Sequence, residues 1–255
     1  MKIIIDAMGG DTAPLEIVKG ALLGMEHWGV EVLLTGDAEA ILRALRDCGH
    51  DTIPRGMEIV HTTETVEMCD DPSKVFRHKK DTSMGVGLTL LRDGKADFVV
   101  TGAIDDIGVE SVIGFGNMNA TANSQEMLDK GIAPRFFSRA NDRRRGGFVE
   151  SQGGGTILLT RGDIALRLGL PVAGVVGFVH SYADGAHTSI PAPGLGALAA
   201  GMGGRSSKLV RDLARLGVDP DDITVVSKHD TSTNANDPNE SELHNTLAHA
   251  IGRED

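Results

Sequence analysis

The stretch ITVVSKHDTSTNANDPNE, residues 223–240, carries the strongest local signals in the chain. It opens with an apolar run rich in β-branched residues, which predicts a strand over 223–226. His229 follows just beyond this strand, and ligands of α/β folds bind beyond the carboxyl ends of strands. Asp237 and Glu240 then predict a capped helix start, with Asp237 as the N-cap. The stretch therefore places a titratable imidazole on a loop between a strand and a helix, and His229 is the first candidate for catalysis.

A lone histidine in a polar turn is ordinarily a loop residue without chemistry, and that interpretation stands beside the catalytic one. The context of His229 favours the second. The pattern His-x-Thr-Ser-Thr, followed by Asn236 and Glu240, resembles the loop that carries the first active-site histidine of β-ketoacyl synthases. It looks most like the ketosynthase region of type I fatty acid synthases. The resemblance covers about residues 100–252 and includes the segments SRANDRRRGGFVE (138–150), GGG (153–155) and SIPAPG (189–194).

The resemblance implies a thiolase-like ketosynthase fragment in this part of the chain. It implies that His229 donates a hydrogen bond to the developing oxyanion of a thioester. It also implies that Thr231 and Thr233 position the pantetheine arm of an acyl carrier protein. Condensation further requires a nucleophilic cysteine and a second histidine. Neither Cys48 nor Cys69 has the surroundings of that nucleophile, because acidic neighbours of Cys69 disfavour the thiolate.

A glycine turn near the other end of the chain is the second candidate site. Residues 2–5 predict a strand, DAMGGD (6–11) a turn, and the apolar spacing after residue 14 a helix. Backbone N–H groups at Gly9, Gly10 and Asp11 would suit a phosphate at a helix N-terminus. An ordinary tight turn explains the two glycines equally simply. Lys80 is a further candidate for phosphate binding, although a solvated helix start explains it as well.

This turn belongs to a wider pattern. Together with AP (13–14), IVH (59–61), DDP (70–72) and KKDTSM (79–84), it resembles the phosphate acyltransferase family over residues 1–101. These enzymes transfer an acyl group from acyl carrier protein to inorganic phosphate, for phospholipid synthesis. The resemblance implies the same substrates for this chain. It covers only the first part of such an enzyme.

Alternating strand and helix patterns predict an α/β fold with a parallel sheet in the N-terminal part. We predict two parts, residues 1–101 and 102–255. The strand at 96–100 marks the seam, and 102–145 is expected to be loosely packed because Gly and Asn are frequent there. The expected strands are 2–5, 30–35, 57–61, 96–100, 156–159, 172–179 and 223–226, and the expected helices begin near 14, 38, 83, 163, 209 and 237.

Composition narrows the class of protein. The chain has 255 residues, of which 40% are hydrophobic and 24% charged, as in soluble globular proteins. A net charge of −11 argues against nucleic acid and anionic membranes as partners. No run approaches the length of a membrane span, and the cytoplasm is the expected location. We expect no nicotinamide cofactor, because the glycine pattern that begins at Gly194 follows two prolines and not a strand. We expect no metal, since His180, Asp184 and His187 fit no standard metal motif. Homo-oligomerisation stays open.

Two functions are consistent with these observations. The first is an acyltransferase-related protein that acts on acyl-carrier-protein thioesters in fatty acid and phospholipid synthesis. The second is a non-catalytic fused or truncated fragment with a structural or oligomerisation role. The glycine turn and the His229 loop favour the first, and the lack of a suitable cysteine favours the second.

Overall fold

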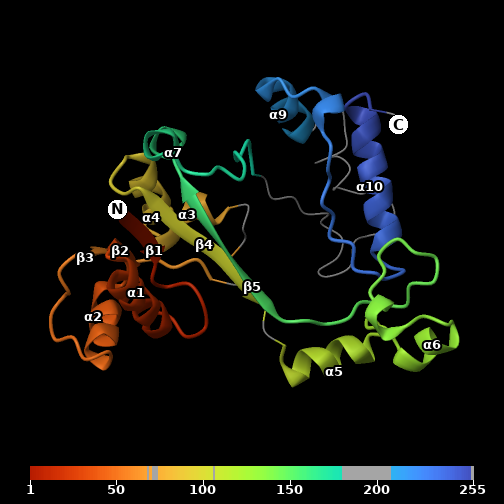
Figure 1. The fold of residues 1–255 in the computed structure, drawn as a ribbon, viewed down its shortest axis with the longest axis horizontal. Helices are drawn as coiled ribbons and strands as arrows, with labels where there is room; N and C mark the ends of the chain where they lie inside the picture. The colour runs from red at the N-terminus through yellow and green to blue at the C-terminus, as the bar shows by residue number, and fades with distance from the viewer. Residues whose placement is uncertain (68, 71–73, 106, 180–207, 254–255) are drawn as a thin grey trace. The chain divides into compact units, whose positions relative to one another are not determined.

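The computed structural model describes residues 1–67, 69–70, 74–105, 107–179 and 208–253. They belong to two compact units. The first comprises Met1–Ile104 and Gly154–Val175, and the second comprises Asp105–Gly153 and Val176–Asp255. Figure 1 shows the elements of both units along the chain. Each unit is described here by itself.

A five-stranded sheet in the order β3-β2-β1-β4-β5 organises the first unit. β1 pairs in parallel with both β2 and β4, and β2 pairs in parallel with β3. The predicted α/β fold with a parallel sheet is therefore confirmed. The strands are β1 (Lys2–Asp6), β2 (Glu31–Gly36), β3 (Met57–His61), β4 (Phe98–Asp105) and β5 (Gly153–Thr160).

Side chains of the central strands alternate between two apolar clusters. Val32 and Leu34 of β2 pack with helices α1 (Leu15–Trp28) and α2 (Ala38–Asp47). Leu33, between them, packs on the other face with Leu91 of α4 (Ser83–Arg92). Because side chains of a strand point alternately to opposite faces, this arrangement buries β2 on both sides. The short helices α3 (Val75–His78) and α7 (Gly162–Leu168) complete the described helices of this unit.

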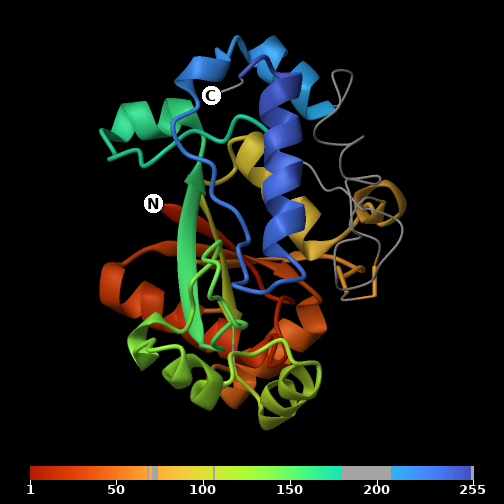
Figure 2. The ribbon, with the colours of Figure 1, turned by 90° about the vertical axis from the view of Figure 1, so that its right-hand side faces the viewer.

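β4 joins strands that are distant in sequence. Ile3 and Ile4 of β1 pair with Phe98 and Val99 at its start, and β5 is its neighbour on the other side. Both ribbon views show β4 and β5 running side by side (Figures 1 and 2). Gly102 permits this approach, because a Cβ there would lie 2.3 Å from the backbone oxygen of Gly155. The strand at the predicted seam is therefore shared between early and late segments of the chain.

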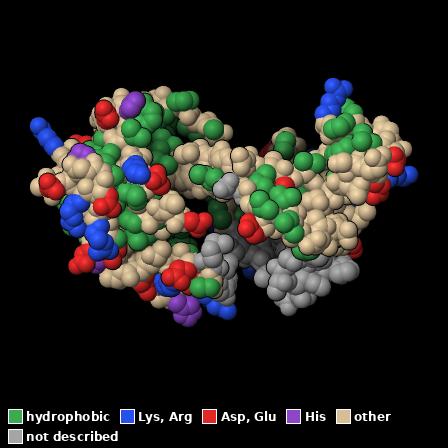
Figure 3. Space-filling model, turned by 90° about the horizontal axis from the view of Figure 1, so that it is seen from below, with side chains coloured by type: hydrophobic (Ala, Val, Ile, Leu, Met, Phe, Trp, Pro, Cys, Tyr) green, Lys and Arg blue, Asp and Glu red, His purple; other side chains and the backbone are tan. Residues whose placement is uncertain are grey.

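The second unit has helices and irregular chain in its described part. Met127, Ile132 and Phe137 form a small buried cluster. No residue of α5 is buried, so the loose packing expected over 102–145 is found around α5 but not around that cluster. Apolar side chains reach the surface on the face drawn in Figure 3. The elements are α5 (Val109–Asn117), α6 (Ser124–Asp129), η1 (Pro134–Phe136), α9 (Lys208–Leu216), η3 (Pro220–Asp222) and α10 (Asp237–Ala250).

Two expected strands are wrong. Residues 172–179 and 223–226 both form irregular chain. Val225 is 80% exposed and Val226 is 51% exposed, so the apolar run before His229 is not buried. A strand needs a neighbour that takes its backbone hydrogen bonds, and neither segment pairs with another within the described residues. High β-propensity alone did not produce a strand here.

Candidate functional site at the His229 loop

His229 lies on irregular chain, eight residues before Asp237, where helix α10 begins. The residue is exposed, and its imidazole makes no hydrogen bond within the part of the chain that the structure describes. Its backbone, in contrast, is held firmly. The N–H of His229 donates to Glu240 Oε1 at 2.5 Å, and the N–H of Asp230 donates to Glu240 Oε2 at 2.8 Å. A single carboxylate thus fixes the backbone on which the imidazole stands.

Glu240 therefore has a different role from the predicted one. A capping-box carboxylate would return to the N-cap of its own helix. Glu240 instead bonds the loop at His229 and Asp230, and it also accepts from the side-chain amide of Asn236 at 2.9 Å. Burial opposes its ionisation, but these hydrogen bonds outweigh burial and hold the pKa of Glu240 below its ordinary value. The carboxylate is therefore ionised, and it accepts strong hydrogen bonds, at neutral pH.

The hydroxyls of Thr231 and Thr233 lie together, as the resemblance implies. Their Oγ1 atoms are 2.9 Å apart, and Thr233 Oγ1 also accepts from the N–H of Asn236 at 3.0 Å. Two hydroxyls carry two hydrogens, and only one of these lies between the pair. The pair can therefore still donate one hydrogen bond to a ligand. Both residues are partly buried.

The carboxylate of Asp237 binds the loop by hydrogen bonds and does not cap helix α10. Its side chain is 1% exposed and lies 3.6 Å from Arg145 Nε. Oδ1 accepts from the N–H of Ser232 at 3.1 Å, and Oδ2 accepts from the N–H of Asn141 at 2.8 Å. Helix α10 begins at Asp237, with Asn236 as an N-cap whose side chain makes no capping bond. The predicted N-cap role of Asp237 is wrong, because this carboxylate joins two segments instead.

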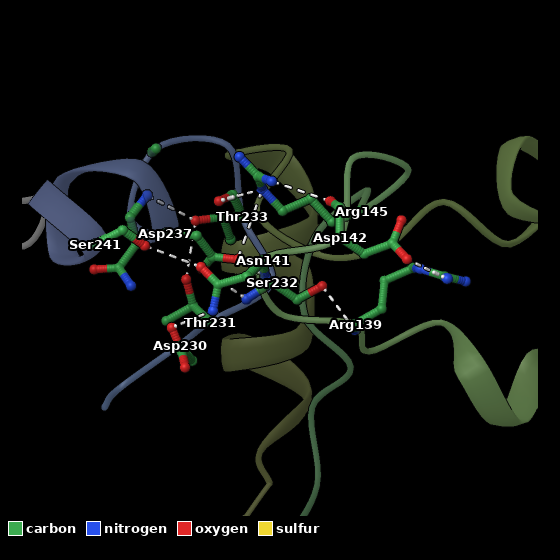
Figure 4. Close-up of polar contacts among 12 residues, drawn as sticks. Arg139, Asn141, Asp142, Arg145, Asp230, Thr231, Ser232, Thr233, Asp237 and Ser241 are labelled. Atoms are coloured by element: carbon green, nitrogen blue, oxygen red, sulfur yellow. Dashed lines mark hydrogen bonds and ion pairs between the residues drawn. The ribbon is translucent and has the colours of Figure 1, made fainter. Parts of the chain in front are cut away.

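We call residues 139–147 and 228–241 the clamp, since hydrogen bonds tie one to the other (Figure 4). The N–H of Arg139 donates to Ser232 Oγ at 3.0 Å, and the N–H of Gly147 donates to Ser232 O at 3.0 Å. Arg145 Nε donates to Thr233 O at 3.1 Å. Ser232 itself is buried. The clamp fixes the residues on either side of Thr231.

Arginines of the clamp are mostly engaged within it. Arg139 Nη2 lies 2.6 Å from Asp142, and Arg144 Nε lies 3.4 Å from the same carboxylate. The hydrogen bond from Arg139 is the largest of the causes that hold the pKa of Asp142 far below its ordinary value. Arg145 faces Asp237. The structure therefore shows internal ion pairs for these three arginines.

His244, one turn after Glu240, is the second imidazole of this region. Its Nε2 lies 3.9 Å from Glu240 Oε1, and its Nδ1 is buried without a hydrogen-bond partner among the described residues. Burial lowers the pKa of His244, against the opposite effect of Glu240. The imidazole is therefore neutral at pH 7.

The glycine turn differs from the predicted phosphate site in one respect. Helix α1 begins at Leu15, and the turn residues 11–14 separate it from Gly9 and Gly10, so these glycines do not form the first turn of the helix. Gly9, Gly10 and Asp11 are exposed, and their N–H groups make no hydrogen bond within the described residues. The carboxylate of Asp6 accepts from Met8 N at 2.9 Å and adds a negative charge to the turn.

The ammonium groups of Lys79 and Lys80 both form hydrogen bonds with other groups of the chain. Lys80 Nζ donates to Phe76 O at 2.9 Å, on the surface. Lys79 Nζ lies 2.7 Å from Asp70 and donates to Thr65 O at 2.9 Å. These contacts agree with a structural role for this pair at the start of α4. Phosphate binding by Lys80 stays a prediction.

Neither cysteine thiol is hydrogen-bonded to a histidine or a cationic side chain among the described residues, although Lys19 acts electrostatically on Cys48 and Lys79 on Cys69. Cys48 packs beside the apolar cluster at the end of α2. Cys69 is exposed, and its Sγ faces a carboxylate oxygen of Glu67 at 3.6 Å. Both cysteines belong to the first unit, whereas His229 belongs to the second.

Other expectations concern metals and membranes. Within the described ranges, no group of three or more His, Cys, Asp and Glu side chains is arranged to hold a metal ion. His180, Asp184 and His187 lie outside the described residues. Among the helices of the described chain, none is long and apolar enough to cross a bilayer.

Sequence reasoning missed Asn141, Asp230 and Ser232 as parts of this site. All three have positive φ, at 61°, 45° and 65°. Asn and Asp are the non-glycine residues that tolerate this conformation best, so their presence in SRAND and KHDTS was a weak signal. The hydrogen bonds across the clamp join residues far apart in the chain, and no local pattern reveals such pairs.

Comparisons with known proteins agree with the two resemblances. A family model described as "Fatty acid synthesis protein" matches residues 1–104, and one described as "Beta-ketoacyl synthase, C-terminal domain" matches residues 172–254. Fatty acid synthase 2 of Mycosarcoma maydis is 39% identical over 171 residues, which are 67% of this chain and 4% of that protein. Phosphate acyltransferase of Clostridioides difficile is 43% identical over 101 residues, which are 40% of this chain and 29% of that enzyme.

The solved structures that are similar to this chain include a β-ketoacyl synthase from Burkholderia phymatum. It aligns with 99% of this chain and 54% of its own, at 18% identity and a TM-score of 0.48. The chain thus spans only a small share of the curated relatives it matches, between 4% and 29% for the two named above. The predicted pair of resemblances is confirmed. The chain is related to proteins of fatty acid synthesis, through phosphate acyltransferase in its first part and through the ketosynthase region of fatty acid synthase in its second.

Proposed function

We propose that the chain acts on acyl-carrier-protein thioesters, as an acyltransferase-related protein of fatty acid and phospholipid synthesis. The observation that supports this most is the His229 loop. An exposed imidazole without a hydrogen-bond partner among the described residues stands on a backbone that Glu240 fixes at two N–H groups. Fixing the backbone lowers the cost of orienting this donor toward a developing oxyanion, and a pre-oriented donor is the requirement for electrostatic catalysis. An acyl carrier protein as partner and a cytoplasmic location are parts of the same proposal.

The neighbouring hydroxyls extend the site toward the rest of a thioester. The pair Thr231–Thr233 retains one hydroxyl hydrogen that can be donated. A pantetheine arm carries amide carbonyl groups that accept such a bond. We therefore assign the thioester carbonyl to His229 and a pantetheine carbonyl to the threonine pair. The clamp keeps the two parts in fixed relation, because Ser232, between the two threonines, is buried and bonded to residues 139 and 147, while Glu240 holds the backbone at His229 and Asp230.

Condensation is not part of this proposal. A β-ketoacyl synthase reaction requires a thiolate that accepts the acyl group, and Cys69 faces a carboxylate while Cys48 packs beside an apolar cluster. Binding of a thioester without carbon–carbon bond formation is the activity that these residues support. A non-catalytic role is the alternative, and it is favoured if the loop does not bind a thioester.

Shift mapping by NMR tests the assignment. Titration of the ¹⁵N-labelled chain with S-octanoylpantetheine should shift the amides of His229, Thr231 and Thr233 before those of other residues. Shifts confined to residues outside 228–241 would show that the loop is not the binding site. The same spectra recorded with free octanoate separate recognition of the pantetheine arm from binding of the acyl chain.

A second candidate activity concerns inorganic phosphate. Three consecutive exposed residues, Gly9, Gly10 and Asp11, have N–H groups without hydrogen bonds in the described chain. Such groups can converge on an anion in a glycine turn. Asp6 opposes this, since its carboxylate lies in the same turn. We propose weak phosphate binding there, with Lys80 as a candidate that must first leave Phe76 O.

A further inference from the structure

Asn141 uses its backbone N–H and both polar atoms of its side chain within the clamp. Its N–H donates to Asp237 Oδ2 at 2.8 Å, and its side-chain Nδ2 donates to Asp230 Oδ1 at 3.0 Å. Its Oδ1 accepts from Ser241 Oγ at 3.1 Å. Figure 4 shows Asn141 between these three partners. Asn141 thus contacts the start of α10 through its backbone, and it contacts the loop at Asp230 and the helix at Ser241 through its side chain.

Two of the residues that Asn141 contacts, Asp230 and Ser241, are the sequence neighbours of His229 and of Glu240, respectively. Asp230 follows His229 directly, and its carboxylate bonds both Lys228 Nζ, at 2.8 Å, and Asn141. Ser241 follows Glu240, whose carboxylate accepts from the N–H of His229. A shift of Asn141 would therefore be transmitted to His229 by two routes, one through Asp230 and one through helix α10.

The backbone of Asn141 supports the same conclusion. Its φ of 61° is left-handed, and so are the φ angles of Asp230 and Ser232. Residues in this conformation cost free energy and persist where the surroundings determine them. Three such residues lie in one clamp beside an exposed imidazole, so the surrounding contacts determine the backbone that carries it.

We propose that Asn141 is a positioning residue for His229. It does not contact the substrate. It holds the carboxylate of Asp230 so that the His229 backbone, and hence the direction of the imidazole, is set before a ligand binds. This inference rests on the proposed function only for its effect on thioester affinity, because its effect on the His229 imidazole is independent of any ligand.

The variants separate positioning from folding. Asn141→Gly keeps the left-handed backbone, which glycine adopts freely, and deletes both side-chain contacts. Asn119→Gly is the matched control, since Asn119 is an exposed asparagine with φ 53° and lies outside the clamp. Asn141→Asp replaces the donor to Asp230 by a repelling carboxylate. The double variant Asn141→Asp with Asp230→Asn restores a donor and an acceptor with their places exchanged.

The readout is the ¹⁵N spectrum of the imidazoles, together with amide hydrogen exchange at His229. Asn141→Gly and Asn141→Asp should shift the His229 imidazole resonances and speed exchange of its amide by about tenfold, and Asn119→Gly should leave both unchanged. The double variant should restore the wild-type resonances. The affinity for S-octanoylpantetheine should fall and recover in parallel.

Three results would overturn the inference. His229 resonances that are the same in Asn141→Gly and Asn119→Gly would show that Asn141 does not position the imidazole. Equal shifts at His27 and His50, which lie in the first unit, would show a general effect on folding. Failure of the exchanged pair to restore the resonances would show that the Asn141–Asp230 bond is not the route. Absence of thioester binding with the expected shifts at His229 would refute the proposed function alone.

Discussion

The buried carboxylate of Asp237 lies 3.6 Å from Nε of Arg145. The same carboxylate accepts hydrogen bonds from two backbone N–H groups of separate segments, those of Asn141 and Ser232. Asp237→Ala should therefore lower the free energy of unfolding of the second unit by about 3 kcal/mol, because it removes the carboxylate that faces Arg145 and leaves two N–H groups without their acceptor. Urea unfolding followed by amide exchange in α10 measures this. Asp237→Asn, which keeps an acceptor oxygen, should cost less. Equal stability of the alanine variant and the wild type would show that the clamp does not hold the unit together.

Stability should depend on pH through His244. Burial lowers the pKa of His244 below its ordinary 6.5 in the folded chain. Between the folded and unfolded values the unfolded state binds more protons, so stability is fully present above pH 6.5 and falls as the pH drops toward the folded value. The urea concentration at the midpoint of unfolding, followed at residues of α10, should decrease as the pH is lowered from 7.5 to 5. Lys228, Glu240 and Asp230 are the charged groups that act on this imidazole.

The control for this prediction is a histidine on the same helix. His244→Gln should remove most of the decrease in midpoint, whereas His249→Gln should leave it in place. A decrease of the same size in His244→Gln would assign the pH dependence to other groups.

Gly102 should resist substitution. An added Cβ would lie 2.3 Å from the oxygen of Gly155, which is backbone of the neighbouring strand and cannot rotate away. Gly102→Ala should lower the free energy of unfolding by about 2 kcal/mol, as overpacking of a fixed backbone does. Gly155→Ala is the matched control, since nothing lies within 4 Å of its Cβ position. If both variants unfold at the same urea concentration, β4 and β5 do not approach as closely as described.

Phosphate should bind weakly at the glycine turn. Titration with inorganic phosphate, followed by amide NMR, should shift Gly9, Gly10 and Asp11 first, because these exposed N–H groups have no other acceptor in the described chain. Asp6→Asn should strengthen the binding by removing a negative charge from the turn. Shifts that begin elsewhere, with the three amides unmoved, would place any anion site outside this turn.

The fold of the first unit could be predicted well from the sequence. Helix α2 and strand β3 have the predicted bounds, because amphipathic spacing and β-branched runs agree with the tertiary contacts there. The run at 223–226 failed because a strand also needs a neighbour, which no local pattern supplies. Asp237 and Glu240 were correctly singled out, but their partners were not. Asn141 contacts Asp237 across a long stretch of sequence, and such pairing is decided by the fold. The bonds from Ser232 to Asp237 and from His229 to Glu240 are closer in sequence, but they depend on a loop conformation that no local pattern reveals.

The central claim is that the His229 loop binds the thioester of an acyl carrier protein. Calorimetric titration of octanoyl-acyl carrier protein into the chain tests it most directly, with His229→Ala as the variant and His50→Ala, an exposed histidine of the first unit, as the control. We expect saturable binding that weakens about tenfold in His229→Ala, because one hydrogen bond to the ligand is lost, and that is unchanged in His50→Ala. Absence of binding by the wild type, or equal affinity in all three proteins, would contradict it.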